Sequence, residues 1–275
     1  MNRFGTVLLA VLMLSGLLVA QQRPALVLTG ARIYPVSSPP IERGTIVIRE
    51  GKIEAIGPAE SVAIPEGASV VHLEGKVVIP GLVDTHSHIG IYPSPMVPAH
   101  ADGNEMTGPV QSALRALDAV WPDDPRIRMA RAGGITTANI MPGSGNVMGG
   151  QTIYVKLRGH TVEDMLIEKD GVYGGMKMAN GENPKRSYGS RNQAPATRMA
   201  ITALQRKQFL RARQYWKKWQ DYQKKRKKDR SVQPPERDLD LEQVVEILQG
   251  KRIVHFHTHR ADDIMTAMRL ADEFG

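Results

Sequence analysis

Residues 77–88, with the sequence VVIPGLVDTHSH, constrain the fold of this chain more than any other segment. An apolar run reaches a Pro-Gly pair, resumes as Leu-Val and then presents two histidines separated by one residue. Side chains alternate between the two faces of a β-strand, so His86 and His88 are expected to point to the same side. Imidazole is a common ligand of divalent zinc, and two rings at this spacing can share one ion. The pattern predicts half of a metal site at the end of a strand; a satisfied pair of surface histidines is the alternative.

The segments on either side of this stretch differ in pattern. From Ala25 to Val78, short runs that alternate apolar and polar residues break at Gly, Pro or Ser, which predicts three or four strands and the start of a small β-sandwich. After His88, strand patterns alternate with helical patterns, which predicts an α/β fold with parallel βαβ units. The strands are expected at 78–84, 135–141, 152–157, 172–178 and 252–257. The helices are expected within 111–132, 162–167, 195–229, 239–249 and 261–274.

The HxH stretch and its lead-in resemble the entry to an amidohydrolase-superfamily enzyme, and the imidazolonepropionase-related branch is the most similar. In that superfamily a small β-sandwich leads into the first strand of a (β/α)8 barrel, which ends in HxH. The resemblance implies a partial sandwich at 26–80 and a partial metal-dependent hydrolase barrel at 81–275, with a basic helical insertion at about 195–230. A closed barrel of this kind has eight strands. Because only about five are expected here, the resemblance predicts an incomplete, C-terminally truncated barrel.

Functional side chains in such barrels lie at the C-terminal ends of the strands. Lys177 ends the fourth expected strand, and the resemblance implies that it is carboxylated, since burial lowers the pKa of a lysine and the neutral amine takes up carbon dioxide. A salt-bridging or solvent-exposed lysine is the alternative. The fifth strand ends in HFHTH, where the superfamily pattern favours His257 as the ligand, with His259 at the rim and His255 deeper. The expected metal ligands are His86, His88, Lys177 and His257.

A glycine-rich segment, PGSGNVMGGQ at residues 142–151, follows the second expected barrel strand. It does not match a phosphate-binding GxxxxGK[ST] loop, since no lysine follows the glycines. An active-site wall that permits close approach of a substrate and a plain turn both fit the pattern, and Gly145 and Asn146 are the candidate substrate contacts. Asp262 or Asp263 is expected to cap the last helix rather than to act in catalysis.

The resemblance implies hydrolysis of an amide-like C–N bond, non-peptide or dipeptide, in a small-molecule substrate by a metal-activated water. One or two divalent ions are expected; zinc is preferred, and manganese or iron are compatible with imidazole and carbamate ligands. The strand-eight aspartate of the superfamily has no counterpart in this chain, so no catalytic residue is assigned and an inactive fragment is expected. The alternative from another class is an exported metal-containing binding protein without catalysis. A homo-oligomer is compatible with either.

The first twenty residues have the features of a secretory signal peptide. Arg3 supplies a positive charge, Val7–Val19 is apolar, and cleavage is expected after Ala20. A retained anchor helix is the alternative, although so short a stretch spans a bilayer poorly. The chain has no cysteine, which excludes disulfides and thiolate ligands. Export to the periplasm or the extracellular space is therefore expected.

The formal net charge of +8 comes from one element. Residues 206–230 contain twelve Lys or Arg and two Asp, a net charge of +10, which leaves −2 for the rest of the chain. Positive charge confined to one segment does not favour a nucleic-acid-binding fold, and no nucleic-acid partner is expected. Aromatic residues at helical spacing predict that one side of this helix docks on the body: Phe209, Trp216, Trp219 and Tyr222. The basic face is then solvated or, alternatively, makes a weak contact with an anionic membrane surface.

Overall fold

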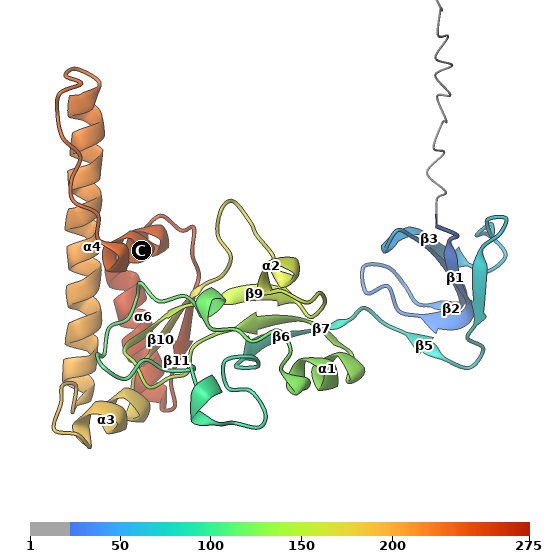
Figure 1. Cartoon of the computed structure of the whole chain (residues 1–275), viewed down its shortest axis with the longest axis horizontal. Coiled ribbons are helices and arrows are strands. Elements are labelled where there is room, and N and C mark those ends of the chain that lie inside the picture. Colours follow the sequence, from blue (N-terminus) through green and yellow to red (C-terminus); the bar gives the residue numbers. More distant parts are fainter. Residues whose placement is uncertain (1–22) are drawn as a thin grey trace, which may run out of the picture. The chain divides into compact units, whose positions relative to one another are not determined.

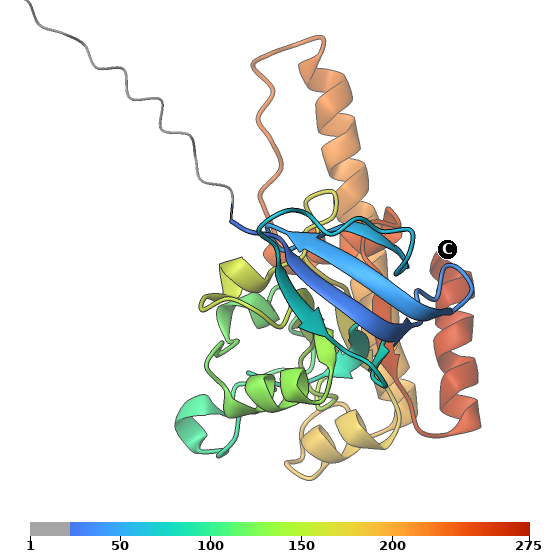
Figure 2. The ribbon, with the colours of Figure 1, turned by 90° about the vertical axis from the view of Figure 1, so that its right-hand side faces the viewer.

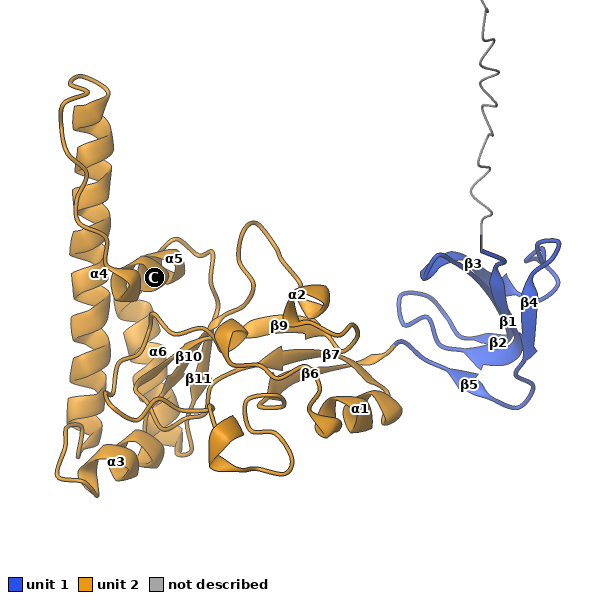
Figure 3. Ribbon diagram, viewed as in Figure 1, with its two compact units in different colours: residues 1–80 blue, residues 81–275 orange. Residues whose placement is uncertain are grey.

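The computed structural model describes residues 23–275, and the predicted signal peptide at residues 1–20 lies outside the described residues. The chain divides into two compact units, residues 1–80 and 81–275 (Figure 3). Within the described range, no helix has the length and apolar character that crossing a bilayer requires.

The first unit contains one five-stranded sheet (Figure 2). Its order is β3-β2-β1-β4, and β5 also pairs with β1. A two-residue turn, Glu50-Gly51, joins β2 to β3, and both residues have positive φ (50° and 75°), as a type I′ hairpin requires. The pairings of β2 with β1 and with β3 are antiparallel, whereas those of β1 with β4 and with β5 are parallel. The strands are β1 Leu26–Ile33, β2 Ile41–Arg49, β3 Lys52–Pro58, β4 Ser69–His72 and β5 Val77–Val78.

The second unit is a mixed α/β structure with two three-stranded sheets, ordered β6-β7-β9 and β11-β10-β8. Only Thr152 separates β8 from β9, so one extended segment pairs with β10 through its first half and with β7 through its second half. The strands are β6 Leu82–Ser87, β7 Ile135–Ile140, β8 Met148–Gln151, β9 Ile153–Lys156, β10 Met176–Ala179 and β11 Val254–His257.

Strand direction corrects one expectation. The pairs β6–β7 and β10–β11 are parallel, as predicted for βαβ units. The strand predicted at 152–157 is present as β9, but β9 is antiparallel to β7, and β8 is antiparallel to β10. The physical reason is that the short connection from β7 to β8 contains no helix, and a parallel crossover needs a dozen or more residues.

Helices account for the remaining regular structure of the second unit (Figure 1). The helical segments predicted within 111–132 are present in part, as a single 3-10 turn and α1, and Pro122 lies in the non-helical segment between them. The short α3 was not predicted. The α-helices are α1 Pro125–Ala132, α2 Val162–Met165, α3 Glu182–Gly189, α4 Arg198–Arg226, α5 Leu239–Leu248 and α6 Ala261–Phe274. The 3-10 helices are Pro98–His100 and Ala116–Asp118.

Side-chain caps fix the start of several helices. The hydroxyl of Thr197 accepts from the backbone N–H of Ala200 at the start of α4, and Thr161 with Asp164 forms a capping box on α2. Asp262 and Asp263 lie in the first turn of α6, where they favour the helix dipole as predicted, but neither caps the helix. Arg260 occupies the cap position without a side-chain bond, because Asp262 pairs with Arg260 and Asp263 is buried against another helix.

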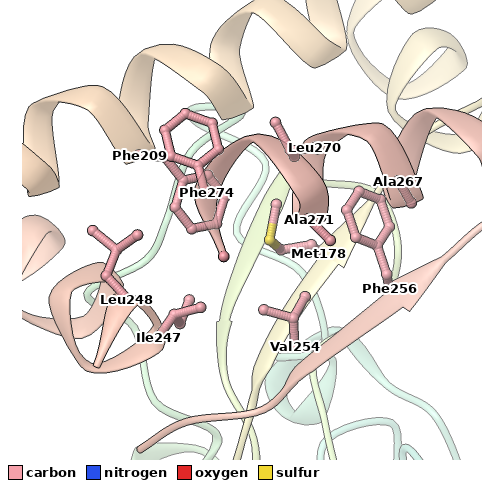
Figure 4. Close-up of a pocket in the computed structure, with 11 residues that line it drawn as sticks. Met178, Phe209, Ile247, Leu248, Val254, Phe256, Ala267, Leu270, Ala271 and Phe274 are labelled. Atoms are coloured by element: carbon pink, nitrogen blue, oxygen red, sulfur yellow. The ribbon is translucent and has the colours of Figure 1, made fainter. Parts of the chain in front are cut away.

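The docking of α4 is confirmed. Phe209 and Tyr222 are buried, and Trp216 and Trp219 pack on the same core as Tyr215, which the sequence pattern did not single out. This core also contains the methionines of β8 and β10 and the apolar face of α5. An apolar pocket of about 140 Å³ lies between these helices and β11, where the rings of Phe209 and Phe274 stack at 4.9 Å (Figure 4). Its lining carries no ligand-type side chain, so it belongs to the core.

Candidate metal centre

A buried lysine is the central feature of the second unit. Lys177 lies in the middle of β10, whose four residues are all buried, and its own side chain is only 1% exposed. Its Nζ lies 3.2 Å from Nε2 of His86 and 3.2 Å from the sulfur of Met141. Among residues 23–275, no carboxylate forms an ion pair with this amine. The alternatives of a salt-bridged or exposed lysine are therefore contradicted.

The two histidines of the HxH stretch lie next to each other at the end of β6. The rings of His86 and His88 are 5.1 Å apart and meet edge to face, so the expectation that both point to one side is confirmed. Nδ1 of His88 lies 2.7 Å from the carbonyl oxygen of Met141. A carbonyl only accepts hydrogen bonds, so Nδ1 carries the proton and Nε2 keeps its lone pair.

The charge balance of this cluster is unusual because nothing negative compensates the amine. Burial lowers the pKa of Lys177 to about 8. Burial, together with the positive charges of Lys177 and then of His88, lowers the pKa of His86 to about 4. His86 is therefore neutral at pH 7, and its nitrogen lone pair is available to an electrophile.

The three histidines in and just after β11 occupy different depths. His257 is near enough for its charge to lower the pKa of His86, but no direct contact between the two rings is found in the described part of the chain. Nε2 of His257 lies 3.0 Å from the amide nitrogen of Asn183 and 3.0 Å from Nε2 of His259. His259 is at the rim, with its side chain 40% exposed and Nδ1 2.9 Å from a carboxylate oxygen of Glu182.

His255 lies one layer deeper, as expected. It is the register partner of Lys177 on the neighbouring strand. Its Nε2 contacts the amide of Asn139 at 3.0 Å and the hydroxyl of Tyr154 at 3.3 Å. Because this nitrogen is bonded to two protein groups, His255 supports the cluster from below. Nε2 of His257 also has two protein partners, Asn183 and His259, and would have to exchange these contacts to bind a cation.

The glycine-rich segment forms a wall of the cluster and is not a plain turn. It includes β8, and a Cβ added to Gly149 would lie 3.6 Å from Cγ of Lys177. The amide nitrogen of Asn146 donates to the carbonyl of Gly108 at 2.9 Å, and its oxygen accepts from Asn104 at 3.1 Å. Asn146 is 1% exposed, so its amide is committed inside the fold. Gly145 packs against Asn104, and its backbone N–H donates to the Asn104 side-chain oxygen. Neither Gly145 nor Asn146 is therefore placed as the predicted substrate contact.

Sequence reasoning missed the residues that orient the histidines. Asn139 and Met141 lie at the C-terminal end of β7. Functional residues are expected at such strand ends, so the position of these two residues was a usable signal. Asn183 and Glu182 begin α3, whose sequence gave no strong helical signal.

The donor set determines what the cluster can hold. Counting only His, Cys, Asp and Glu, no group of three in the described part of the chain is placed to hold a metal ion. A centre with His86 and His88 therefore depends on Lys177 as a further donor. Two neutral imidazoles beside a buried amine provide nitrogen donors of the kind that divalent transition metals prefer.

Comparisons with known proteins point to one superfamily. No family model matches the chain. The amidohydrolase tasK of Hapsidospora irregularis is 33% identical over 254 residues, which cover 85% of this chain and 24% of that protein. An imidazolonepropionase of Rhizobium rhizogenes is 28% identical over 138 residues, covering 44% of this chain and 34% of that protein.

A solved structure agrees with these relatives. The amidohydrolase from Thermotoga maritima MSB8 superposes with a TM-score of 0.83 at 40% identity and covers 91% of this chain and 62% of its own. The chain thus spans less than two thirds of each of these proteins. The α/β fold and the histidine-lysine cluster define a hydrolase-type scaffold with a candidate metal centre. The chain belongs to the amidohydrolase superfamily.

Proposed function

We propose that this chain carries the metal-binding part of a hydrolase that cleaves amide-like C–N bonds in small molecules. His86, His88, Lys177 and His257 would hold one or two divalent cations, zinc in preference to manganese or iron. The observation that carries the proposal is the buried amine of Lys177, 3.2 Å from an imidazole nitrogen and without a carboxylate partner. An uncompensated buried charge is costly, which is typical of functional rather than structural positions.

The residues present fit such a cation. Nε2 of His88 keeps a free lone pair because Nδ1 is bonded to the Met141 carbonyl, an arrangement typical of metal-binding histidines. The pKa of His86, lowered to about 4, keeps that ring neutral at pH 7 as a ligand must be. A cation bound here would supply Lewis acidity towards an amide carbonyl and towards water.

Lys177 is proposed to contribute as a carbamate. The neutral amine adds carbon dioxide and releases one proton, which converts a nitrogen donor into an anionic group with two oxygens. Burial favours this step because it lowers the pKa of the amine to about 8 and so populates the neutral form near neutral pH. The carbamate also provides the negative charge that the cluster of imidazoles lacks.

The surrounding residues position the donors and shape the space around them. The Met141 carbonyl fixes the ring of His88, Asn183 holds His257, and Asn139 holds His255 beneath the amine. Gly149 packs closely against the side chain of Lys177 and forms a wall of the cluster. We further propose that the two sheets of residues 81–275 are part of a (β/α)8 barrel. Turnover is proposed for a protein that also carries the parts of its relatives that this chain does not span.

The proposal includes export of the protein, based on the apolar segment after Arg3. A fusion of residues 1–30 to a reporter that is active only outside the cytoplasm tests this point. Export of the reporter supports the proposal, and retention contradicts it.

Metal content tests the site. The purified chain is incubated with zinc, desalted and analysed for bound metal. About one or two ions per chain are expected for the wild type, and loss of metal for the double variant H86A/H88A. The matched control is H72A/H160A, which removes two exposed histidines elsewhere. Equal metal content in both double variants would contradict the proposal.

Catalysis is tested separately with N-acyl amino acids and dipeptides, on this chain and on a longer version that spans the full length of its relatives. Metal-dependent hydrolysis by the longer version, lost in H86A/H88A, supports the enzyme. Metal binding with no hydrolysis by either version would support the metal-containing binding protein instead.

A further inference from the structure

Most cations in the first half of α4 are paired with carboxylates or packed on the body, although Lys207 has no ion pair in the described range. In the second half none is paired with a carboxylate. Arg206 forms a 2.8 Å ion pair with Glu273, and Arg211 a 3.4 Å pair with Asp238. The guanidinium of Arg213 lies 4.8 Å over the ring of Phe274. These cations of the first half therefore bind α4 to the body of the second unit.

The second half and the turn that follows it, residues 217–230, are named here the basic tip. It contains eight Lys or Arg and two Asp, a net charge of +6. All eight cationic side chains are exposed, and within the described range none forms an ion pair with a carboxylate. Of the two acids, Asp229 is held by the backbone N–H and hydroxyl of Ser231 in its own turn. The basic tip thus presents a strong positive field without an internal partner.

The basic tip has the chemistry of a surface that meets a plane of phosphates. Of its two aromatic residues, Trp219 packs on the core shared with α5 and Tyr222 is buried, so neither ring is exposed for stacking on a base. Six of the eight cations are lysines, and one of the two arginines, Arg226, lies over the ring of Tyr222 at 5.6 Å. Flexible ammonium groups suit diffuse attraction to anionic headgroups, whereas nucleic-acid recognition relies on arginine forks and stacking.

The position of the tip is compatible with such a contact. In both views of the ribbon, the C-terminal end of α4 extends beyond the sheets of the second unit, at the end opposite α3 (Figures 1 and 2). The candidate metal centre lies towards α3, since β10 leads into that helix and β11 leads into the start of α6. A surface that binds the tip therefore leaves the metal centre open to solvent.

We infer that the basic tip docks the chain on an anionic lipid surface. The attraction is electrostatic and needs no insertion of apolar side chains, so it weakens as salt rises. This inference is independent of the proposed hydrolysis, because no residue of the tip belongs to the metal centre.

Binding to vesicles tests the inference. The full chain is sedimented with vesicles of phosphatidylcholine alone or with 30% phosphatidylserine. We expect binding only to the anionic vesicles, and its loss between 0.05 and 0.5 M NaCl. Each lysine near an anionic membrane contributes about 1 kcal/mol, which corresponds to about fivefold in affinity. The variant K224Q/K225Q/K227Q/K228Q, which lacks four of them, is therefore expected to bind at least about 100-fold more weakly.

The matched control removes the same charge elsewhere, in K52Q/K76Q/K169Q/K251Q, whose four lysines are also exposed. Its binding is expected to stay within about threefold of the wild type, and thermal melting checks that both variants fold. Equal loss in both quadruple variants would overturn the inference, since net charge alone would then explain binding. Equal binding to neutral vesicles, or tighter binding to duplex DNA or RNA than to anionic vesicles, would also overturn it.

Discussion

Replacing Lys177 by methionine is expected to stabilise the metal-free chain. Burial lowers the pKa of this amine from an ordinary 10.5 to about 8, and at about 1.4 kcal/mol per pH unit the buried charge costs about 3 kcal/mol. The 3.2 Å contact with His86, about 1 kcal/mol, is lost in the variant. A methionine has a similar shape and joins Met141, Met176 and Met178, so little packing is lost. The net gain is about 2 kcal/mol, or roughly 4–8 °C in the midpoint of unfolding.

The gain depends on pH in a defined direction. Below pH 8 the amine is protonated in both the folded and the unfolded chain, so the folded wild type bears the full cost. Between pH 8 and 10.5 the folded wild type loses the proton while the unfolded chain keeps it, and the cost disappears. The advantage of K177M should therefore be complete at pH 7 and vanish towards pH 10.5.

Chemical denaturation with a chelator present measures both effects. The control variant, K156M, changes an exposed lysine that donates to Thr137, and should alter the free energy of unfolding by less than about 0.5 kcal/mol. Destabilisation of K177M by more than about 1 kcal/mol at pH 7 would refute the reasoning. So would an advantage that persists unchanged to pH 10.5. Either result would mean that the ammonium is compensated in the folded chain.

Three further outcomes follow from the structure. D263A should be clearly destabilising, because it removes a buried carboxylate bonded to Arg198 at 2.8 Å. The exposed D262A should lose much less stability, and equal losses in denaturant melts would contradict this. G174A should lose about 1–3 kcal/mol of stability, because the new Cβ would lie 2.0 Å from the carbonyl oxygen of Thr152. The control G133A should lose less, since its Cβ would lie 3.4 Å from the nearest atom. Similar melting temperatures of the two variants would contradict this prediction. Zinc at 100 times its dissociation constant should stabilise the wild type by about 2.7 kcal/mol in calorimetry, and a comparable rise in H88A would argue against His88 as a ligand.

Much of the cluster could be predicted because its residues lie at strand ends, where sequence position determines direction. The alternation along β6 placed His86 and His88 on one side, and the end of β11 placed His259 at the rim and His255 deeper. The burial of Lys177 was open at the sequence level, since a lysine in MKMA is compatible with a surface strand. Its burial depends on contacts distant in sequence, with His86 and Met141 at the amine and β8 and β11 on the neighbouring strand positions.

The features that could not be predicted depend on contacts distant in sequence. The antiparallel direction of β9 follows from the short, helix-free connection after β7. No local pattern indicates that the same extended segment pairs with β10 through β8 and with β7 through β9. The predicted caps of α6 were wrong because Asp263 is bound by Arg198, 65 residues earlier. Asn146 was a candidate substrate contact by its position in the glycine-rich segment, yet its amide is held by Gly108 and Asn104 from a neighbouring segment.

The central claim is that His86 and His88 at the end of β6, the buried Lys177 of β10 and His257 at the end of β11 surround a divalent cation. Crystals of the chain grown with zinc and measured at the zinc absorption edge test it most directly. We expect an anomalous peak about 2.0–2.3 Å from ring nitrogens of His86 and His88, next to Lys177. A peak only at exposed histidines such as His72 or His160, with none at His86 and His88, would contradict it.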